Sequence, residues 1–429
     1  ISGDLRARPI TSLTLPSSGQ STGYARRLPP MSNVMSERTK WRRPSVPGAC
    51  VVLACLFLTS CSYAPRVPAA GDLFGQHVRT TVDSEVARYY LENYLQGEDE
   101  NHALSGRIDA LHREYVRSPP SREDLSALSR VFSVDFAALF LAHRLLTDEC
   151  NRALNQSFAS YLQFEAGVNP GIVSSYVVLF VPGWDYARNG HVTGADFAKP
   201  RELVSRFGLE NHLVELPPTG SVERNATVLA SEIARRSRSG KKIILASASS
   251  AGPAVQLVLG EMLSERDQDS VKAWLNLGGI LQGSPLVDYL AARPWVFSPI
   301  VWLKGWEKEA IRSMSTSRSR SRFARLDIGS GILVVNYLGV PLSGQLSRFS
   351  RDNYPILSSD GPNDGLTMLA DAIAPNSLTI VALGSDHFFA EDPQIDEKTV
   401  ALMKLMLAYV ESDITSGSSR CPRLRIGHG

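Results

Sequence analysis

Short apolar runs alternate with segments of helical periodicity between positions 176 and 279. The runs end at Val181, Leu216, Leu245 and Leu277, and apolar residues three or four positions apart recur in the segments between them. Continuous apolar runs of about four to eight residues are typical of parallel strands that are buried on both faces. The alternation therefore predicts a parallel sheet whose strands are joined by right-handed helical crossovers.

Two further apolar runs, at 332–337 and 378–383, have the same character, and a helical pattern near Val410 follows them. We expect residues 171–429 to form one α/β domain. Residues 286–329 break the alternation. This segment is too long for a simple connection, and it holds three of the six tryptophans, namely Trp295, Trp302 and Trp306. It is either a lid over a site for an apolar substrate or an ordinary packed helical excursion.

Residues 82–170 are expected to form a helical subdomain. Apolar residues recur there at helical spacing, and a Ser-Pro-Pro-Ser stretch at 118–121 separates two helical groups. The subdomain either packs on the α/β domain or serves as an interaction module. The first interpretation is favoured, because an amphipathic helix usually buries its apolar face against its own chain.

The start of the chain has the pattern of an export signal. Residues 1–34 show no periodicity. From Met35 onward, basic residues precede an apolar run at 49–58, which ends in Leu-Thr-Ser-Cys61. The run is too short to cross a bilayer. We therefore predict that residues 1–61 are a non-structural extension plus an export signal, and that residues 62–81 are a tether.

Composition adds limits to this picture. The chain has 429 residues, of which 43% are apolar, and a formal net charge of +2. This length is enough for one large domain or two smaller ones. A charge so close to zero gives no indication of nucleic-acid binding.

One of the predicted strands runs directly into a helix at Ser249. The stretch from Lys241 to Gly252 reads KKIILASASSAG. A nucleophile at such a turn needs small residues two positions before and two positions after it, because strand and helix approach closely there. Ser247 and Ala251 occupy these positions. By itself the stretch is equally compatible with an ordinary polar turn.

An acid and a histidine follow in the chain. Asp364 lies in a DGPNDG loop after the run at 332–337, and His387 follows the run at 378–383. A serine hydroxyl is a poor nucleophile until a histidine takes its proton, and a carboxylate fixes the tautomer of that histidine. Ser249, Asp364 and His387 are therefore the candidate catalytic triad. Asp360, in the same loop, is the alternative acid, since Asp-Gly pairs are also common in turns.

The order of serine, acid and histidine, each just beyond a predicted strand, resembles the α/β-hydrolase family. The resemblance covers the chain from Tyr176 to about Val410. The turn departs from the Gly-x-Ser-x-Gly pattern of the family, because Ser247 and Ala251 replace the two glycines. The resemblance implies an α/β-hydrolase fold with the 286–329 insertion as a lid or cap. It calls for no metal and no organic cofactor.

The same resemblance implies an oxyanion hole. The run at 177–181 ends in Pro-Gly-Trp184, where similar lipases have His-Gly. In those enzymes the N–H after the glycine binds the developing oxyanion, together with the N–H of the residue that follows the nucleophile. The corresponding donors here are Trp184 and Ser250. The alternative is a plain glycine turn beside a packed tryptophan.

Leu-Thr-Ser-Cys61 is similar to the lipobox of bacterial lipoprotein precursors, in which the cysteine is lipidated and becomes the mature N-terminus. An apolar start with an incidental cysteine is the alternative. By the same resemblance, Ser62 implies an outer-membrane anchor that faces the periplasm. The two cysteines within the signal would be removed, so Cys150 and Cys421 are left to form one disulfide in this oxidising space.

Together these features predict a lipid-anchored serine hydrolase of the bacterial envelope. It would be an esterase or lipase that acts on carboxylic esters through an acyl-enzyme. An acyltransferase or thioesterase would use the same triad, and a non-catalytic envelope-binding lipoprotein on the same fold is a further alternative. The expected partners are an ester substrate, with lipids among the candidates, and the membrane through lipidated Cys61. Neither the substrate nor the oligomeric state follows from the sequence.

Overall fold

The computed structural model describes residues 66–163, 170–329 and 331–416. All of them belong to one compact unit. The predicted export signal, Cys61 and Cys421 lie outside the described residues. None of the helices described is long and apolar enough to cross a membrane.

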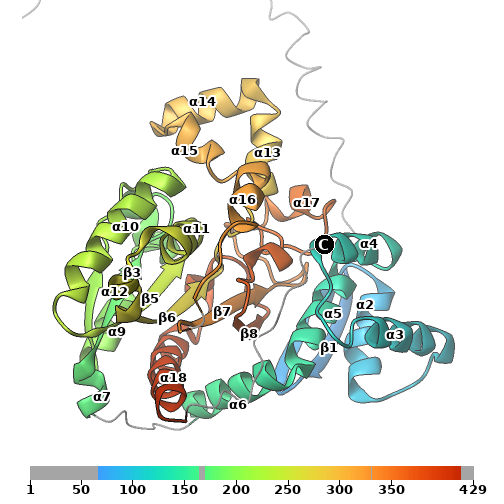
Figure 1. The fold of residues 1–429 in the computed structure, drawn as a ribbon. Helices are drawn as coiled ribbons and strands as arrows, with labels where there is room; N and C mark the ends of the chain where they lie inside the picture. Colours follow the sequence, from blue (N-terminus) through green and yellow to red (C-terminus); the bar gives the residue numbers. More distant parts are fainter. Residues whose placement is uncertain (1–65, 164–169, 330, 417–429) are drawn as a thin grey trace, which may run out of the picture. The chain divides into compact units, whose positions relative to one another are not determined.

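Six parallel strands form the central sheet, in the spatial order β4-β3-β5-β6-β7-β8 (Figure 1). The strands are β3 (Tyr176–Val181), β4 (Glu210–Leu213), β5 (Lys242–Ala248), β6 (Val271–Leu277), β7 (Leu333–Val340) and β8 (Leu378–Leu383). The strand order reverses once, because β4 lies on one side of β3 and β5 lies on the other. In open parallel sheets, ligands bind beyond the carboxyl ends of the strands at such a reversal.

Helices cover both faces of this sheet. Along β5, Ile243 and Leu245 join the apolar cluster on one face, whereas Ile244 and Ala246 join the cluster on the other. Burial on both faces explains why the strands appear as continuous apolar runs in the sequence. The helices of the α/β part, apart from the insertion, are α7 (Pro170–Ser175), α8 (Tyr186–Thr193), α9 (Ala198–Arg206), α10 (Val222–Ser237), α11 (Ala251–Leu257), α12 (Glu265–Ser270), α17 (Tyr354–Leu357) and α18 (Ile395–Ser416).

Residues 67–82 form a β-hairpin, where the sequence analysis predicted a tether. β1 (Val67–Leu73) and β2 (Gln76–Val82) pair antiparallel. Leu73, Val78 and Val82 are buried in one cluster with the helices that follow. The tether prediction was wrong for these residues because their apolar side chains pack against segments far away in the sequence.

The predicted helical segment follows the hairpin. α5 (Val134–Thr147) is buried along most of its length, because it packs against α2, α4 and α6 and against the strands β7 and β8. The helices of this segment are α2 (Glu85–Glu92), α3 (His102–Glu114), α4 (Arg122–Val131), α5 (Val134–Thr147) and α6 (Glu149–Gln163).

Side-chain amides bond the outer edge of β8. Asn151 and Asn155 of α6 bond the N–H and the carbonyl of Thr379, each at 2.8 Å. Asn155 also accepts from the N–H of Val381 at 3.0 Å, and Gln76 of β2 donates to the carbonyl of Val381 at 2.9 Å. These amides occupy the positions that a further strand would take, and they tie both α6 and the hairpin to the sheet.

A buried ion pair also joins the helical segment to the α/β domain. Arg122, the first residue of α4, donates to Asp371 at 2.7 Å, and the side chain of Asp371 is only 1% exposed. Burial raises the pKa of Asp371 to about 6, although Arg122 and Arg320 oppose this shift. Asp371 lies seven positions after Asp364. The ion pair therefore fixes the loop that carries the candidate acid.

Replacing Arg122 with methionine is expected to destabilise the fold by about 3–5 kcal/mol at about pH 8, because the carboxylate of Asp371 would be left buried without its main partner. The folded pKa of about 6 lies above the ordinary value of 3.8, so ionising Asp371 costs stability as the pH rises through 6. The loss should therefore be smaller at about pH 5, where the folded carboxyl is mostly protonated. Urea unfolding at the two pH values measures both losses.

The control for this experiment is Arg113→Met. Arg113 is an exposed arginine of α3 that forms no ion pair within the described residues. It should unfold like the parent chain at both pH values. Equal, small losses for the two variants would show that the pair with Asp371 does not hold the loop.

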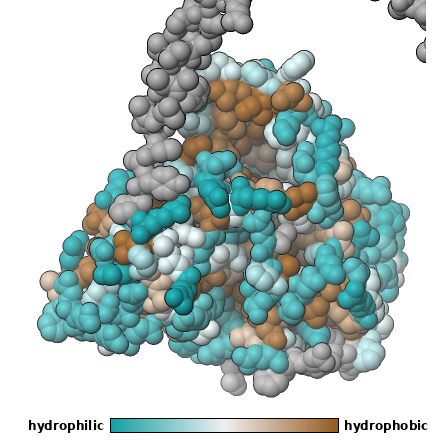
Figure 2. All heavy atoms as spheres, turned by 180° about the vertical axis from the view of Figure 1, so that it is seen from behind, coloured by the Kyte–Doolittle hydropathy of each residue, from teal (hydrophilic) through white to brown (hydrophobic). Residues whose placement is uncertain are grey.

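The insertion at 286–329 folds into four helices that lie next to one another (Figure 1). Figure 2 shows apolar side chains exposed near the top of the view, the end of the domain at which α14 (Pro294–Lys304) lies. The four helices are α13 (Pro285–Ala291), α14 (Pro294–Lys304), α15 (Lys308–Arg312) and α16 (Thr316–Phe323).

Candidate active site

Ser249 lies at a strained turn between β5 and α11. Its φ angle is 55°, in the left-handed region that residues with a side chain rarely adopt. Its N–H donates to the carbonyl of Leu277 at 3.1 Å, and its own carbonyl accepts from Gly252 and Ile280, also at 3.1 Å. Three main-chain hydrogen bonds therefore hold this conformation. A strand-turn-helix with a strained serine is the geometry of a nucleophile elbow.

The residues around the turn explain its altered sequence. Ser247 is fully buried, and its hydroxyl accepts from Nε1 of Trp274 at 2.8 Å. The hydroxyl that replaces the first glycine of the pattern is thus satisfied. A Cβ on Gly252 would lie 2.9 Å from Cα of Gly279, which is too close for any side chain. The need for glycine therefore falls on position 252, one residue later than in the family pattern.

The structure brings the three predicted triad residues together. Nε2 of His387 lies 2.8 Å from Oγ of Ser249, and its Nδ1 lies 2.7 Å from Oδ2 of Asp364. The histidine is 7% exposed and the aspartate 2%. The three residues follow β5, β7 and β8, at the carboxyl edge of the sheet. An imidazole between a hydroxyl and a carboxylate is the arrangement that activates a serine.

Main-chain donors fix the carboxylate of Asp364. Its Oδ1 accepts from the N–H groups of Leu366 and Thr367 at 2.9 and 2.8 Å, which leaves Oδ2 for the imidazole. The carbonyl of Asp364 also accepts from the N–H of His387 at 2.9 Å. Asp360, the alternative acid, is exposed and lies 3.9 Å from Arg122. Of the two carboxylates, the one that contacts the histidine is Asp364.

Asp386, which is adjacent to the histidine in the sequence, supports the histidine loop. Its Oδ2 accepts from the N–H of Ser347 at 2.7 Å, and its Oδ1 accepts from the N–H of Phe388 at 2.8 Å. It therefore ties the loop before α17 to the residues on either side of His387. Its position next to the histidine was the only sequence signal for this role.

Two main-chain N–H groups remain open beside Ser249. The N–H of Gly183 donates to Ala195, and that of Asp185 donates to Pro218. Within the described residues, the N–H of Trp184 between them has no acceptor, and neither does the N–H of Ser250. A Cβ built on Gly183 would lie 3.4 Å from Cβ of Ser249, so the turn after β3 lies against the elbow. The N–H groups of the predicted donors are thus free, that of Ser250 directly after the nucleophile and that of Trp184 in the turn that lies against the elbow.

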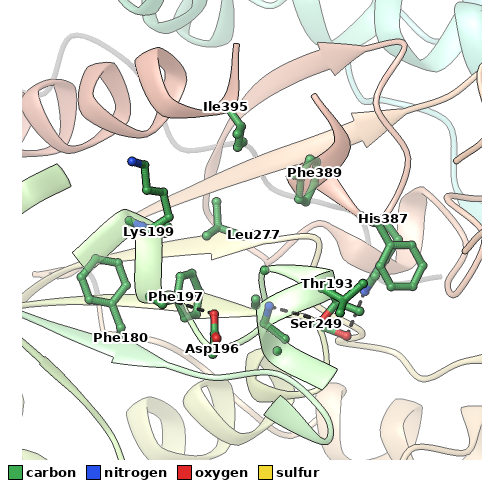
Figure 3. Close-up of a pocket in the computed structure, with 18 of the residues that line it drawn as sticks. Phe180, Thr193, Asp196, Phe197, Lys199, Ser249, Leu277, His387, Phe389 and Ile395 are labelled. Atoms are coloured by element: carbon green, nitrogen blue, oxygen red, sulfur yellow. Dashed lines mark hydrogen bonds between the residues drawn. The ribbon is translucent and has the colours of Figure 1, made fainter. Parts of the chain in front are cut away.

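A cavity of about 880 Å³ opens at Ser249 and His387. Figure 3 shows the serine beside the histidine, with Phe180 and Ile395 farther away along the cavity. Most of the wall is apolar, and α8, α9 and α18 contribute to it as well as the strand ends. The residues that line it include Phe180, Leu275, Leu277, Tyr337, Phe389 and Met403. Burial raises the pKa of Tyr337, so its hydroxyl stays neutral.

The segment at 189–200 forms one wall of this cavity, and the sequence analysis did not identify it. It is rich in glycine and polar residues, including Asn189, Thr193 and Asp196. Such residues carry no hydrophobic periodicity. Phe197, which precedes α9, adopts a left-handed conformation with a φ of 53° where the chain turns into that helix.

The three tryptophans of the insertion take different positions. Trp306 lines the cavity and packs edge-on against Trp184, with ring centroids 5.6 Å apart. Trp295 and Trp302 do not line it, since they are 72% and 83% exposed on α14. The prediction of a substrate-facing role fits Trp306 but was wrong for these two. The reason is that α14 turns Phe297, not the tryptophans, toward the core.

Two further predictions concern metal binding and the disulfide. Within the described residues, no group of three or more His, Cys, Asp and Glu side chains could hold a metal ion. Cys150 is disulfide-bonded. The other four cysteines lie outside the described residues, so the pairing of Cys150 with Cys421 stays a prediction.

Comparisons with known proteins find similar solved structures. No family model matches the chain, and neither does any curated protein. A metagenomic carboxyl esterase, MGS0156, is 20% identical over 58% of this chain and 78% of its own, with a TM-score of 0.46. The mature form of the Bacillus licheniformis lipase BlEst2 is 20% identical over 56% of this chain and 95% of its own, with a TM-score of 0.44. Lipase 1 from Pelosinus fermentans is 14% identical over 56% of this chain and 98% of its own, with a TM-score of 0.39.

The fold itself rests on the geometry described above. A parallel sheet covered by helices on both faces, with a strained serine after β5 and an acid and a histidine after β7 and β8, is the α/β-hydrolase arrangement. The predicted fold class is confirmed.

Proposed function

We propose that this protein is a serine hydrolase that cleaves carboxylic esters. The observation that carries the proposal is the hydrogen-bonded line from Ser249 through His387 to Asp364, with distances of 2.8 and 2.7 Å. A buried, correctly ordered set of three such groups has one well-understood use, which is to activate the serine hydroxyl as a nucleophile at neutral pH. The alternative of a non-catalytic binding protein gives no reason for the strained serine to be held against the imidazole.

The reaction follows from the roles that the geometry supports. Ser249 Oγ attacks the ester carbonyl while Nε2 of His387 takes its proton. The tetrahedral intermediate collapses as the imidazolium gives that proton to the departing alkoxide, which leaves as an alcohol. A water molecule then attacks the acyl-enzyme with the same histidine as base, and the acid and free Ser249 are released. Asp364 stabilises the imidazolium throughout.

The oxyanion would lie against the N–H groups of Trp184 and Ser250. Both are main-chain donors on rigid turns, and both are free of other acceptors within the described residues. Preorganised donors of this kind stabilise the charge that develops on the carbonyl oxygen, typically by about 3–4 kcal/mol for each donor. Because the donors are backbone groups, the proline that replaces histidine before Gly183 does not remove them.

The cavity supports an ester with a substantial apolar part. Its wall of phenylalanine, leucine and methionine side chains would remove an acyl or alkyl chain from water, which is favourable in proportion to the apolar area buried. We therefore propose an esterase or lipase.

We also propose that the protein is anchored in the bacterial envelope through lipidated Cys61. The support is the sequence order of basic residues, short apolar run and Leu-Thr-Ser-Cys. Metabolic labelling of the expressed chain with a palmitate analogue tests this part by itself, because Cys61→Ser should remove the label while ester hydrolysis persists.

A fluorophosphonate probe is expected to label the chain covalently at Ser249. Such probes react with an activated serine hydroxyl and mimic the tetrahedral intermediate. Peptide mass mapping should place the adduct on Ser249, and Ser249→Ala should abolish labelling. Ser247→Ala is the matched control, because its hydroxyl is buried and bonded to Trp274. Labelling that survives in Ser249→Ala would rule out the proposed nucleophile.

A further inference from the structure

The outward face of α14 is apolar and uncovered. Trp295, Trp302 and Leu303 stand at helical positions i, i+7 and i+8, so they share one side of the helix. They are 72%, 83% and 76% exposed. Phe297 and Val301 point the other way and are buried in the core. The helix therefore has two apolar sides, and only the inner one is buried.

This face lies beside the mouth of the catalytic cavity. Lys304, the last residue of α14, lines the cavity, and so does Trp306 two positions later. Apolar side chains gather at the same end of the domain in Figure 2. Anything that covers the outer side of α14 would therefore lie next to the entrance used by the substrate.

Four cations, Arg188, Arg293, Lys304 and Lys308, lie on α14 or directly beside it, and none of them forms an ion pair within the described part of the chain. Arg188 donates to the carbonyl of Lys304 at 2.8 Å, and Lys308 donates to the hydroxyl of Ser298 at 3.0 Å. Arg293, just before α14, stacks over a tyrosine ring at 3.7 Å. Their positive charges are not neutralised by carboxylates.

The acidic residues nearby are already engaged. Glu307 lies 3.9 Å from Arg224, and Glu309 pairs with Arg318. The electrostatic character of the rim is thus set by Arg188, Arg293, Lys304 and Lys308. An exposed apolar patch with unpaired cations near it is complementary to a membrane, which has an apolar interior and can carry anionic head groups at its surface.

We propose that this face of α14 docks on a membrane surface that contains anionic lipid. Trp302, Trp295 and Leu303 enter the boundary between head groups and acyl chains, where indole rings are favoured. The four cations contact the anionic head groups. A second copy of the chain fits less well, since a twofold contact through α14 would bring the same four cations together. The inference does not depend on the chemistry at Ser249.

The first test uses fluorescence of the full chain carrying Cys61→Ser, so that no acyl anchor contributes. The vesicles are made of phosphatidylcholine and phosphatidylglycerol with brominated acyl chains, which quench indoles that enter the bilayer. Tryptophan emission should be quenched in the parent chain, and Trp295→Phe with Trp302→Phe should remove most of this quenching. Quenching that is equal in both proteins overturns the proposal.

The second test measures partitioning of the same chain into those lipids without bromine. Trp302→Ser with Leu303→Ser should weaken binding about tenfold or more, because the buried apolar area is lost. Val116→Ser with Val131→Ser removes two side chains that are 65% and 63% exposed on the helical segment, and it should change nothing. Arg293→Gln with Lys308→Gln should weaken binding to anionic vesicles and leave the weaker binding to pure phosphatidylcholine unchanged.

Two other readouts separate this proposal from its rivals. Hydrolysis of a short soluble ester should be unchanged in Trp302→Ser with Leu303→Ser, since neither residue lines the cavity. If the proposed enzyme activity is wrong, the parent chain itself will not hydrolyse the ester, and this result does not bear on the membrane proposal. Sedimentation velocity tests the second copy as occupant. A dimer that is lost in this variant, without any change in vesicle binding, overturns the membrane proposal.

Discussion

His387→Ala is expected to lower kcat for a soluble ester by about 10⁴-fold or more, with little change in KM. The imidazole is the only base within hydrogen-bond reach of Ser249 in the described structure, at 2.8 Å, so no other side chain there can take the proton. KM should change little because the apolar cavity that binds the ester is left intact. Steady-state kinetics on a series of nitrophenyl esters gives both constants.

The double variant Ser249→Ala with His387→Ala provides the decisive comparison. When two residues act as one catalytic unit, removing the second after the first causes little further loss of kcat. The kcat of the double variant should therefore be no lower than that of the slower single variant. His77→Ala is the control, because His77 is exposed on β2 and far along the chain from the triad. If the fold-decrease in kcat of the double variant equals the product of the two single decreases, the two side chains act separately and the hydrogen bond between them is incidental.

Asp364→Asn is expected to lower kcat by about 10³–10⁴-fold, whereas Asp360→Asn should leave it within about twofold. The N–H groups of Leu366 and Thr367 hold one side-chain oxygen at position 364. An asparagine there would keep its carbonyl on those donors and present its NH₂ to Nδ1 of His387. The imidazole would then carry its proton on Nε2, where it cannot accept one from Ser249.

The same pair of variants decides between the two acids of the DGPNDG loop. Asp360 is exposed and its nearest ionic neighbour is Arg122 at 3.9 Å, so neutralising it removes no contact with the histidine. Thermal melts of both proteins check that the loop is intact. A large loss of activity in Asp360→Asn with normal activity in Asp364→Asn would mean that the loop rearranges when substrate binds.

The sheet was predictable from the sequence because its strands are buried on both faces. β3, β5, β6, β7 and β8 all coincide with continuous apolar runs. β4 differs: the apolar run was at 213–216, but the paired residues are Glu210–Leu213. As an edge strand it is only half-buried and carries Glu210, Asn211 and His212. Val214 and Leu216 are buried without belonging to the strand.

The candidate site was predictable only where chain order determined it. Parallel strands bring their carboxyl ends to one edge, so side chains that follow β5, β7 and β8 had to lie near one another. Chain order does not predict the direction in which a side chain points. The periodicity of α14 marks an apolar helix but does not say which side faces inward, so the sequence did not show that Trp295 and Trp302 face outward. The hairpin at 67–82 was missed because its contacts are with segments far away in the sequence. Gln76, for example, bonds to β8, about 300 residues later.

The amide side chains along β8 have a consequence for the behaviour of the whole molecule in concentrated solution. An uncovered border strand offers its main-chain groups to any extended chain and is a common starting point for intermolecular association. Here Asn151, Asn155 and Gln76 already occupy the groups at Thr379 and Val381. The segment from the hairpin to α6 therefore covers this edge of the sheet and opposes aggregation. This protection is present only while that segment stays attached.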